Sequence, residues 1–476
     1  MQKPEPCAAI FDYRCEPSWP PLAWLAVCRD GDHRIVVRHG ADVETRPESF
    51  CEAVWDGDFS AGGFDQTENV FGSGARLRED KLVFVSSFGT CDRLQYLKLG
   101  ETWYVSNSLV CLSAALNLQF DPWYPWHYED IASICAGIDS YKSGIRSSRG
   151  DVQLVYHRNL VWDGRCLREV VKSESSLNFG NYRAYRSFLE TVLMRLADNG
   201  RARKRRVKYA PISTCSSGYD SLAVTALSRV MGNREVICVP HDRIARDDSG
   251  AELVRCLDME PLIVARDAWR QESFAEAPFV AADACGRDVW IAGAQEHLRR
   301  RLLLTGQRGG PPWHWPPTGH GADFRRTDPG GLSLTEYRLE LGLLHCPVPM
   351  IGTRATGQIH AISASDEMGP WRLKNDYDRP IARRIIEEAG IARGSFATRK
   401  TATAVHLFRR VDFDRFMPGT PSFRDFLRWL REESRNNPAP KTAAELTTPA
   451  REPVEVPLFR HLFPWALLRQ KRIYLT

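Results

Sequence analysis

The chain of 476 residues lacks the features by which several protein classes are known. Its 13 cysteines are an odd number and form no C-x-x-C pair, which disfavours both a disulfide framework and a common zinc site. No apolar run approaches the roughly 18 residues of a membrane helix. Neither sign of charge dominates, because 64 basic residues face 59 acidic ones. We therefore expect a cytoplasmic protein with reduced thiols, no transmembrane segment and no nucleic acid as its main partner.

Two sequence signals are also missing. The stretch MQKPEPCAAIFDYRCE has no long apolar core and no small-residue cleavage site, so that we expect no signal peptide. The phosphate loop G-x-x-x-x-G-K-[ST] does not occur, which argues against an ordinary kinase or GTPase. A nucleotide site in this chain must therefore be of another kind.

Short apolar segments divide the chain into three parts, with boundaries that we place at 1–178, 179–431 and 432–476. The first part alternates such segments with Gly- and Asp-containing turns, which predicts a β-rich region. From residue 207 onward, strand-like runs alternate with helical periods, which predicts an α/β region with a parallel sheet. We expect strands at 81–88, 102–110, 151–157, 207–214, 234–240, 261–266 and 300–306, and helices at 182–196, 220–230, 248–257, 333–344 and 379–390.

The later helices and the C-terminal part carry further local signals. The predicted helix at 333–344 opens with a capping box, Ser333 with Glu336 three residues on. Residues 432–455 have the composition of a flexible linker. We interpret the apolar and basic end, residues 458–476, as a segment that docks on the body, with a membrane-surface or partner segment as the alternative.

The stretch STCSSGYDSLAVTAL, residues 213–227, carries the clearest chemical signal. A turn of small residues between a parallel strand and a helix exposes backbone N–H groups, and the helix dipole there favours an anion. Asp220 would repel a phosphate, so its expected role is to hold Mg²⁺. Hydroxyl donors to phosphate oxygens would be Ser213, Thr214, Ser216, Ser217 and Ser221. The alternative is an ordinary Ser-rich turn in which Asp220 is a helix N-terminal charge.

The hexapeptide SSGYDS, residues 216–221, resembles the S-G-G-x-D-S pyrophosphate loop (PP-loop) of the ATP pyrophosphatase superfamily, with Ser217 where the first glycine usually lies. That superfamily includes asparagine synthetase, β-lactam synthetase and lasso-peptide cyclases. Further segments similar to asparagine synthetases are 84–116, 247–264, 301–310, 338–349 and 399–404. The resemblance covers roughly residues 30–410. It implies a degenerate glutamine-amidotransferase-like domain of the Ntn-hydrolase type, rich in β-structure, followed by an α/β parallel-sheet PP-loop synthetase domain.

The same resemblance implies a site for ATP and Mg²⁺. Residues implied to bind ATP or its pyrophosphate are Ser216, Ser217, Gly218, Tyr219, Asp220, Ser221, Val236, Val239 and Gly306. Asp220 would hold the metal, and the main chain of 236–239 would meet adenine. Lys400 would neutralise charge on the phosphates, or is a plain surface lysine. Arg338 would bind the substrate carboxylate or phosphate, or forms a helix-face salt bridge.

Several departures from the family pattern shape these expectations. Glutamine-using members need a mature N-terminal cysteine. Cys7 is preceded by six residues, so we expect no glutaminase activity. The second nucleotide loop, usually S-G-E-G-A-D-E, reads GQRGG here and lacks the acids. Asp323 is a candidate compensating metal ligand, and Arg308 either meets phosphate or is a loop charge. Asp366 and Glu367 either face the substrate or cap a turn.

The expected function is an AMP-forming, ATP-dependent carbon–nitrogen ligase that activates a carboxylate as an acyl-adenylate. The carboxylate would belong to a small molecule or a peptide, and the nitrogen would come from an amine or ammonia. An intramolecular amine would make the protein a cyclase. A catalytically inactive scaffold on the same fold is a second hypothesis. An RNA-directed member is a third, motivated by the basic run at 201–208, which we interpret as a solvated connector. The sequence leaves open whether the protein forms a homodimer.

Overall fold

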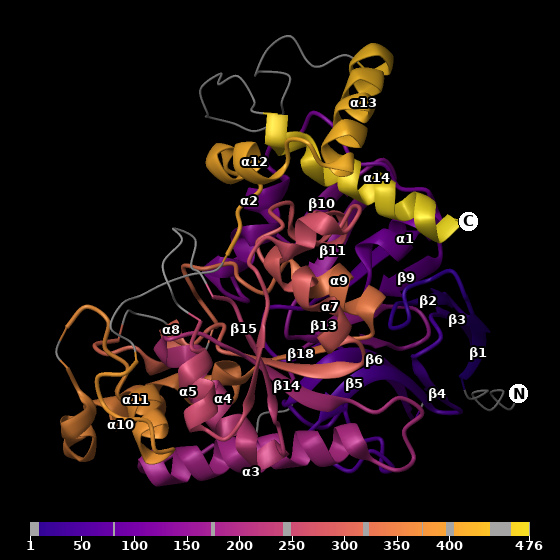
Figure 1. The fold of residues 1–476 in the computed structure, drawn as a ribbon. Helices are drawn as coiled ribbons and strands as arrows, with labels where there is room; N and C mark the ends of the chain where they lie inside the picture. The colour runs from indigo at the N-terminus through magenta and orange to yellow at the C-terminus, as the bar shows by residue number, and fades with distance from the viewer. Residues whose placement is uncertain are drawn as a thin grey trace, which may run out of the picture.

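The protein is described by a computed structural model that covers residues 9–79, 81–172, 177–240, 249–317, 323–373, 375–396, 404–437 and 458–475. Three β-sheets form its framework, and helices surround the third sheet (Figure 1). In this part of the chain, no helix has the length and apolarity that crossing a bilayer requires.

Two β-sheets make up the N-terminal region. In spatial order, the first consists of β1 (Ile10–Cys15), β3 (Arg34–His39), β2 (Trp24–Arg29), β9 (Thr102–Ser106), β8 (Leu94–Leu99), β11 (Gly150–Val155) and β10 (Gly144–Ser147). The second consists of β13 (Leu167–Val170), β12 (Asn159–Trp162), β7 (Lys81–Val85), β6 (Val70–Arg78), β5 (Ser49–Trp55) and β4 (Glu44–Arg46). All strand pairs are antiparallel except β1 with β3. The predicted β-rich region is confirmed.

These two sheets pack face to face over a shared apolar core. Trp24 of the first sheet is fully buried and lies between Phe50 and Phe84 of the second sheet, with ring centroids 5.0 and 6.1 Å away. Alternation along the strands supplies the remaining inward side chains, such as Ile35 and Val37 of β3. Burial of these aromatic and branched side chains is the main stabilising contribution of the sandwich.

The third sheet is parallel throughout and has five strands. Its spatial order is β16 (Glu260–Ile263), β15 (Glu235–Cys238), β14 (Ala210–Cys215), β17 (Arg301–Thr305) and β18 (Leu344–Pro347). The predicted parallel α/β region is therefore confirmed. The sequence did not predict strand β18, since residues up to 344 were assigned to a helix that ends at residue 341 in the structure. Gly342 takes a φ of 72° there, and the chain turns out of the helix into the strand.

The helices are distributed between the sheets and both ends of the molecule. They are α1 (Leu109–Leu116), α2 (His127–Ala132), α3 (Tyr182–Arg201), α4 (Tyr219–Ser228), α5 (Ala251–Cys256), α6 (Ala277–Asp283), α7 (Gln295–Leu298), α8 (Gly310–Trp313), α9 (Leu334–Leu341), α10 (Thr356–Ala364), α11 (Pro380–Glu388), α12 (Arg410–Phe416), α13 (Pro421–Asn436) and α14 (Leu462–Leu475). Figure 1 shows α3 along one end of the molecule and α12, α13 and α14 gathered at the opposite end.

The C-terminal helix α14 packs on the body of the protein, against α1 and α6. Its residues Leu462, Phe463 and Trp465 are buried. The interpretation of the chain end as a docking segment is therefore confirmed. The preceding helix α13 extends to Asn436, so that the first residues of the predicted 432–455 linker are helical; residues 438–457 lie outside the described residues.

A buried ion cluster joins the N-terminal sheets to the α/β region. Arg338 of α9 is 1% exposed and donates two hydrogen bonds to the carboxylate of Glu52 in β5, at 2.7 and 3.2 Å. Its Nε donates to Asp92 at 2.8 Å. Burial alone would lower the pKa of Arg338, but the charges of Asp92 and Glu52 raise it overall. The cluster fixes α9 to the edge of the sandwich.

The helix α9 does not begin with the expected capping box. Ser333 Oγ donates to Asp288 at 2.6 Å, and the carboxylate of Glu336 accepts from Ser108 Oγ at 2.6 Å and from the backbone N–H of Leu109 at 2.7 Å. Both side chains thus bond to other elements, and Glu336 serves the first turn of α1. The capping-box prediction is wrong because tertiary partners compete with the local ones.

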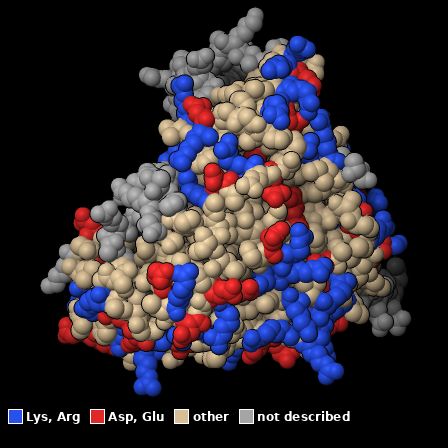
Figure 2. All heavy atoms as spheres, in the orientation of Figure 1, with Lys and Arg blue, Asp and Glu red and all other residues tan. Residues whose placement is uncertain are grey.

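The basic run at 201–208 is only partly a solvated connector. Arg205 is 4% exposed and donates to the carbonyl oxygens of Asn199 and Ala53, at 2.7 and 2.5 Å. It connects the end of α3 to β5 and is unavailable to a large polyanion. On the face drawn in Figure 2, basic and acidic side chains are intermixed. Neither observation favours an RNA-directed function.

Replacing Arg338 with alanine should destabilise the protein by about 3–5 kcal/mol, because two buried carboxylates would lose their partner. Urea denaturation measures the change. The triple variant R338M/E52Q/D92N removes all three charges and should recover most of the loss. If R338A were as stable as the original protein, the cluster would not hold the two regions together.

Candidate functional site

The third sheet has a topological switch point between β14 and β17. From β14 the chain proceeds outward through β15 and β16, then returns to the other side of β14 with β17 and β18. All five strands are parallel, so the carboxyl ends of β14 and β17 lie at the same edge. Ligands of open α/β sheets bind in the crevice at such a point. Here the crevice is flanked by the turn at 216–221 and the loop at 306–310.

A pocket of about 680 Å³ occupies this crevice. Backbone and side chains from the ends of three strands, from two loops and from the start of α11 surround it. Its lining includes Thr214, Cys215, Ser216, Gly218, Asp220, Ser221, Ile237, Val239, Arg287, Asp288, Trp290, Thr305, Gly306, Gln307, Arg308, Gly309, Gly310, Arg326, Asp328, Asp376, Tyr377 and Arg379. Four of the residues that the sequence predicted to bind pyrophosphate therefore line one cavity, namely Ser216, Gly218, Asp220 and Ser221.

The turn at 216–221 is organised by its own hydroxyl groups. Ser216 Oγ lies 2.8 Å from Ser221 Oγ, and the N–H of Ser216 donates to Ser221 Oγ at 3.0 Å. The N–H of Gly218 donates to Ser216 Oγ at 3.3 Å. Gly218 is the N-cap of α4, and no side chain within the described ranges caps this helix. The N-terminal end of α4, where the helix dipole is positive, thus lies at the pocket, as in anion sites.

The loop after β17 approaches the start of α4 at two glycines. A Cβ on Gly306 would lie 2.4 Å from the backbone nitrogen of Ser221. A Cβ on Gly309 would lie 2.4 Å from the Asp220 carboxyl carbon. Only glycine permits this proximity, because any side chain would collide with α4. The GQRGG loop therefore has a structural reason for its glycines, besides any contact with a ligand.

Asp220, which lies against Gly309, forms an ion pair with Arg379. Arg379 Nη1 lies 2.6 Å from both carboxylate oxygens of Asp220, and the two side chains are 6% and 21% exposed. Both oxygens that would coordinate Mg²⁺ therefore already accept from a guanidinium. No group of three or more candidate metal ligands occurs in the described part of the chain. The donor set does not fit a metal held by Asp220.

Arginine side chains supply the positive charge of the pocket. Arg308 has a φ of 74°, is 9% exposed and donates through Nη1 to the carbonyl oxygen of Asp328. Arg326 is 5% exposed, and burial together with the neighbouring Arg308 lowers its pKa to about 10. Two of the acids already have partners: Asp328 pairs with Arg287 at 2.9 Å, and Asp288 accepts from Gln307 at 2.9 Å. Because Arg308 and Arg326 form no ion pair with another described residue, additional negative charge beside these two side chains is favoured.

The structure separates the predicted ATP-binding residues into two groups. Those that line the pocket are Ser216, Gly218, Asp220, Ser221, Val239 and Gly306, and Ser217 lies between them on the turn. Tyr219 is fully buried, and its hydroxyl accepts a hydrogen bond from Arg383 of α11. Val236 is buried in the middle of β15. The side chains of Tyr219 and Val236 therefore belong to the core, whereas Ile237 and Val239 of the predicted adenine segment line the pocket.

The other predicted residues lie elsewhere. Arg338 is bound to Glu52 and Asp92 in the interior, so its assignment to substrate binding is wrong. Asp323 pairs with Arg325 at 3.5 Å outside the pocket lining, which removes it as a compensating metal ligand. Lys400 and Cys7 lie outside the described residues.

Asp366 and Glu367 begin a short 3₁₀ segment, Asp366–Trp371. Glu367 pairs with Arg384 at 2.7 Å. This position favours the interpretation that Asp366 and Glu367 cap a turn over the interpretation that they face the substrate.

Sequence reasoning did not identify Arg379 and Arg326. Arg379 immediately precedes Pro380 at the start of α11, a helix that the sequence did predict. Its role depends on the packing of α11 against α4, which no local pattern reveals. Arg326 lies in an irregular segment, and its partners are the backbone of Thr90 and the thiol of Cys135. Only the arginine-rich composition of these segments offered a signal.

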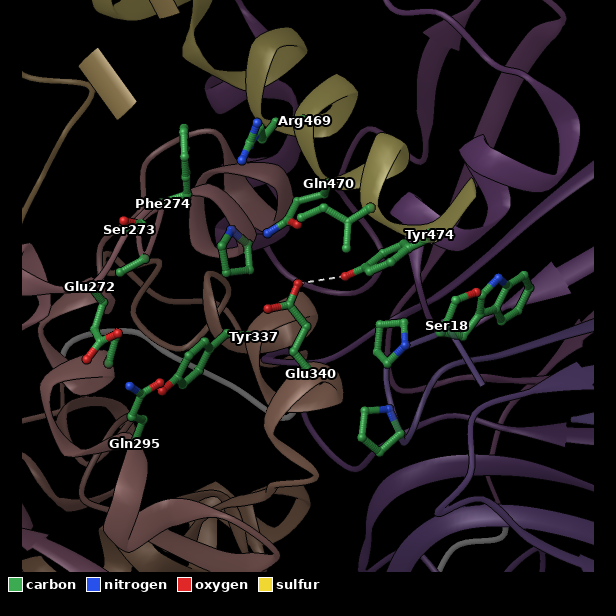
Figure 3. A pocket seen from close by; sticks show the side chains of 17 residues that line it. Ser18, Glu272, Ser273, Phe274, Gln295, Tyr337, Glu340, Arg469, Gln470 and Tyr474 are labelled. Carbon is green, nitrogen blue, oxygen red and sulfur yellow. Dashed lines mark hydrogen bonds between the residues drawn. The ribbon is translucent and has the colours of Figure 1, made fainter. Parts of the chain in front are cut away.

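A second cavity of about 400 Å³ lies between α9 and α14 (Figure 3). Glu340 points into this region, and its carboxylate accepts from the hydroxyl of Tyr474 at 2.6 Å. Burial raises the pKa of Glu340 to about 7. A carboxylate at this position would repel phosphate, so that this cavity is the poorer candidate for a nucleotide.

Comparison with known proteins adds no further assignment. The chain matches no protein-family model, and a search of curated proteins finds no match. The function must therefore be argued from the geometry of the site.

Gly306→Ala should destabilise the protein by about 1–3 kcal/mol, because the new methyl group must push the β17 loop away from α4. Gly310→Ala is the matched control, since its Cβ would meet only the Arg379 side chain at 3.6 Å. Thermal denaturation compares the two variants. Equal stability of both would mean that the loop relaxes without cost and that the close approach is unimportant.

The free energy of unfolding of Glu340→Gln, compared with that of the original protein, should be higher at pH 8 than at pH 5. An acid with a raised pKa contributes stability below its unfolded pKa near 4.5 and loses it as pH rises through about 7. The difference between variant and original protein should grow by an amount on the order of 2–3 kcal/mol over this range. Urea denaturation across pH measures it, with exposed Glu296→Gln as the control. A pH-independent difference would contradict the raised pKa.

Proposed function

We propose that the protein is an ATP-dependent, AMP-forming carbon–nitrogen ligase of the asparagine synthetase type, with ATP bound in the pocket at the switch point. One observation carries the proposal. The Ser-rich turn at the start of α4 and the glycine loop after β17 converge beside buried arginines at the edge of a parallel sheet. The volume of about 680 Å³ falls within the range of ligand pockets.

The pocket offers two kinds of lining that suit the two ends of a nucleotide. Ile237, Val239 and Trp290 supply apolar and aromatic surface against which a purine can pack. Arg308 and Arg326 supply positive charge for the phosphates. A neutral sugar would leave this positive charge without a partner.

The proposed reaction has two steps. A substrate carboxylate attacks the α-phosphorus of ATP, giving an acyl-adenylate and pyrophosphate. A nitrogen nucleophile then attacks the acyl carbon, forms the amide and releases AMP. The protein would contribute by positioning the reactants and by stabilising the charge that moves to the leaving pyrophosphate. The first turn of α4 and the arginines of the pocket would stabilise the charge on the pyrophosphate.

The source of nitrogen would be ammonia or a substrate amine. The β-rich N-terminal region then serves as a degenerate glutaminase-like domain with a structural role. Its buried link to α9 through Arg338 supports such a role, because that helix follows the pocket loops directly in sequence.

A second candidate function is a binding protein without catalysis. The pairing of Asp220 with Arg379 favours it, since the carboxylate that the resemblance assigns to Mg²⁺ is engaged by another side chain. Release of pyrophosphate in the presence of carboxylates separates the two functions. The ligase requires such release, and the binding protein does not show it.

ATP should bind the protein, and the double variant S216A/S221A should bind it at least about tenfold more weakly, because two hydroxyl donors to charged oxygens are lost. Calorimetric titration measures both affinities. The control is Ser395→Ala, a change at an exposed serine outside the pocket. Unchanged affinity of the double variant would place ATP elsewhere, and no ATP binding by any form would overturn the proposed function.

A further inference from the structure

Three buried arginines of the main pocket have N–H groups without an acceptor. Arg308 is 9% exposed, and Arg326 and Arg379 are each 5% exposed. Among the described residues, nothing accepts a hydrogen bond from Nε and Nη2 of Arg308, from Nη1 of Arg326 or from Nε of Arg379. Buried charged donors of this kind are costly unless an acceptor reaches them. They point to an anionic oxygen ligand.

Electrostatics in the pocket leads to the same conclusion. Burial of Arg326 and its proximity to Arg308 both disfavour its charge, which lowers the pKa of Arg326. Two of the acids at the pocket are engaged, Asp220 by Arg379 and Asp328 by Arg287. A polyanion would supply the acceptors and relieve the repulsion at once.

A divalent cation faces the opposite situation. To reach both oxygens of Asp220 it would have to displace Arg379, whose Nη1 lies 2.6 Å from each of them. The loop that follows β17 offers Arg308 instead of an acid. At the first position the carboxylate is therefore occupied by a guanidinium group, and at the second position a guanidinium group stands where a metal-dependent site would place a carboxylate.

We infer that the pocket binds the phosphate chain of ATP through Arg308 and Arg379, together with the N–H groups at the start of α4, and without a divalent cation. The inference rests on the proposed function, because it concerns the same pocket and the same nucleotide. Arg379 keeps its contact with Asp220 through Nη1 and presents Nε to the ligand. Arg326 contributes charge from behind Arg308.

The test is calorimetric titration of ATP into the full chain, once with excess EDTA and once with excess Mg²⁺. The two affinities should agree within about threefold. Arg308→Gln should weaken ATP binding at least tenfold in EDTA, whereas exposed Arg325→Gln should leave it unchanged. Asp220→Asn removes the carboxylate that competes for Arg379, so it should bind ATP at least as tightly as the original protein. Circular dichroism confirms that each variant is folded.

The outcomes separate the inference from the proposed function. Binding that requires Mg²⁺ and disappears in Asp220→Asn would overturn the inference and leave ATP as the ligand. Absence of ATP binding under both conditions, in folded protein, would overturn both. Binding in EDTA that Arg308→Gln does not weaken would overturn the role of the arginines.

Discussion

The close approach of the β17 loop to the first turn of α4 determines the shape of the pocket. Gly306 and Gly309 lie so near to Ser221 and Asp220 that a side chain at either glycine would overlap them. The paired strands β14 and β17 end at the same edge of the sheet, and this contact places the loop after β17 beside the start of α4 in the lining of one pocket. The positive end of the α4 dipole, which favours an anion, lies at that pocket.

The charges of the pocket follow from that geometry. Because the β17 loop lies against Asp220, the space beside this carboxylate is filled from the other side by Arg379 at the start of α11. The loop itself supplies Arg308 in the left-handed conformation. The pocket thereby combines a helix N-terminus with buried guanidinium groups, and both features select negatively charged oxygens. Under the proposed function, recognition of phosphate would then need no cation held by the protein.

The β-rich and parallel α/β regions could be predicted from the sequence, since alternation and helix periodicity are local properties. The position of the turn at 216–221 between a strand and a helix could also be predicted, because its small residues and the strand before it are adjacent in sequence. Arg338 could not be assigned, since its partners Glu52 and Asp92 come from a distant part of the chain. The same holds for Arg379, whose contact with Asp220 depends on how α11 packs on α4, and for Glu336, which bonds to α1 rather than to its own helix.

A crystal structure of the protein with a non-hydrolysable ATP analogue, grown with Mg²⁺ present, tests the central claim most directly. The predicted result is an analogue in the pocket at the switch point, its phosphate oxygens within hydrogen-bond distance of Arg308 and of the first turn of α4, with Arg379 still paired to Asp220. An analogue outside this pocket, or a magnesium ion on Asp220 with Arg379 displaced, would contradict it.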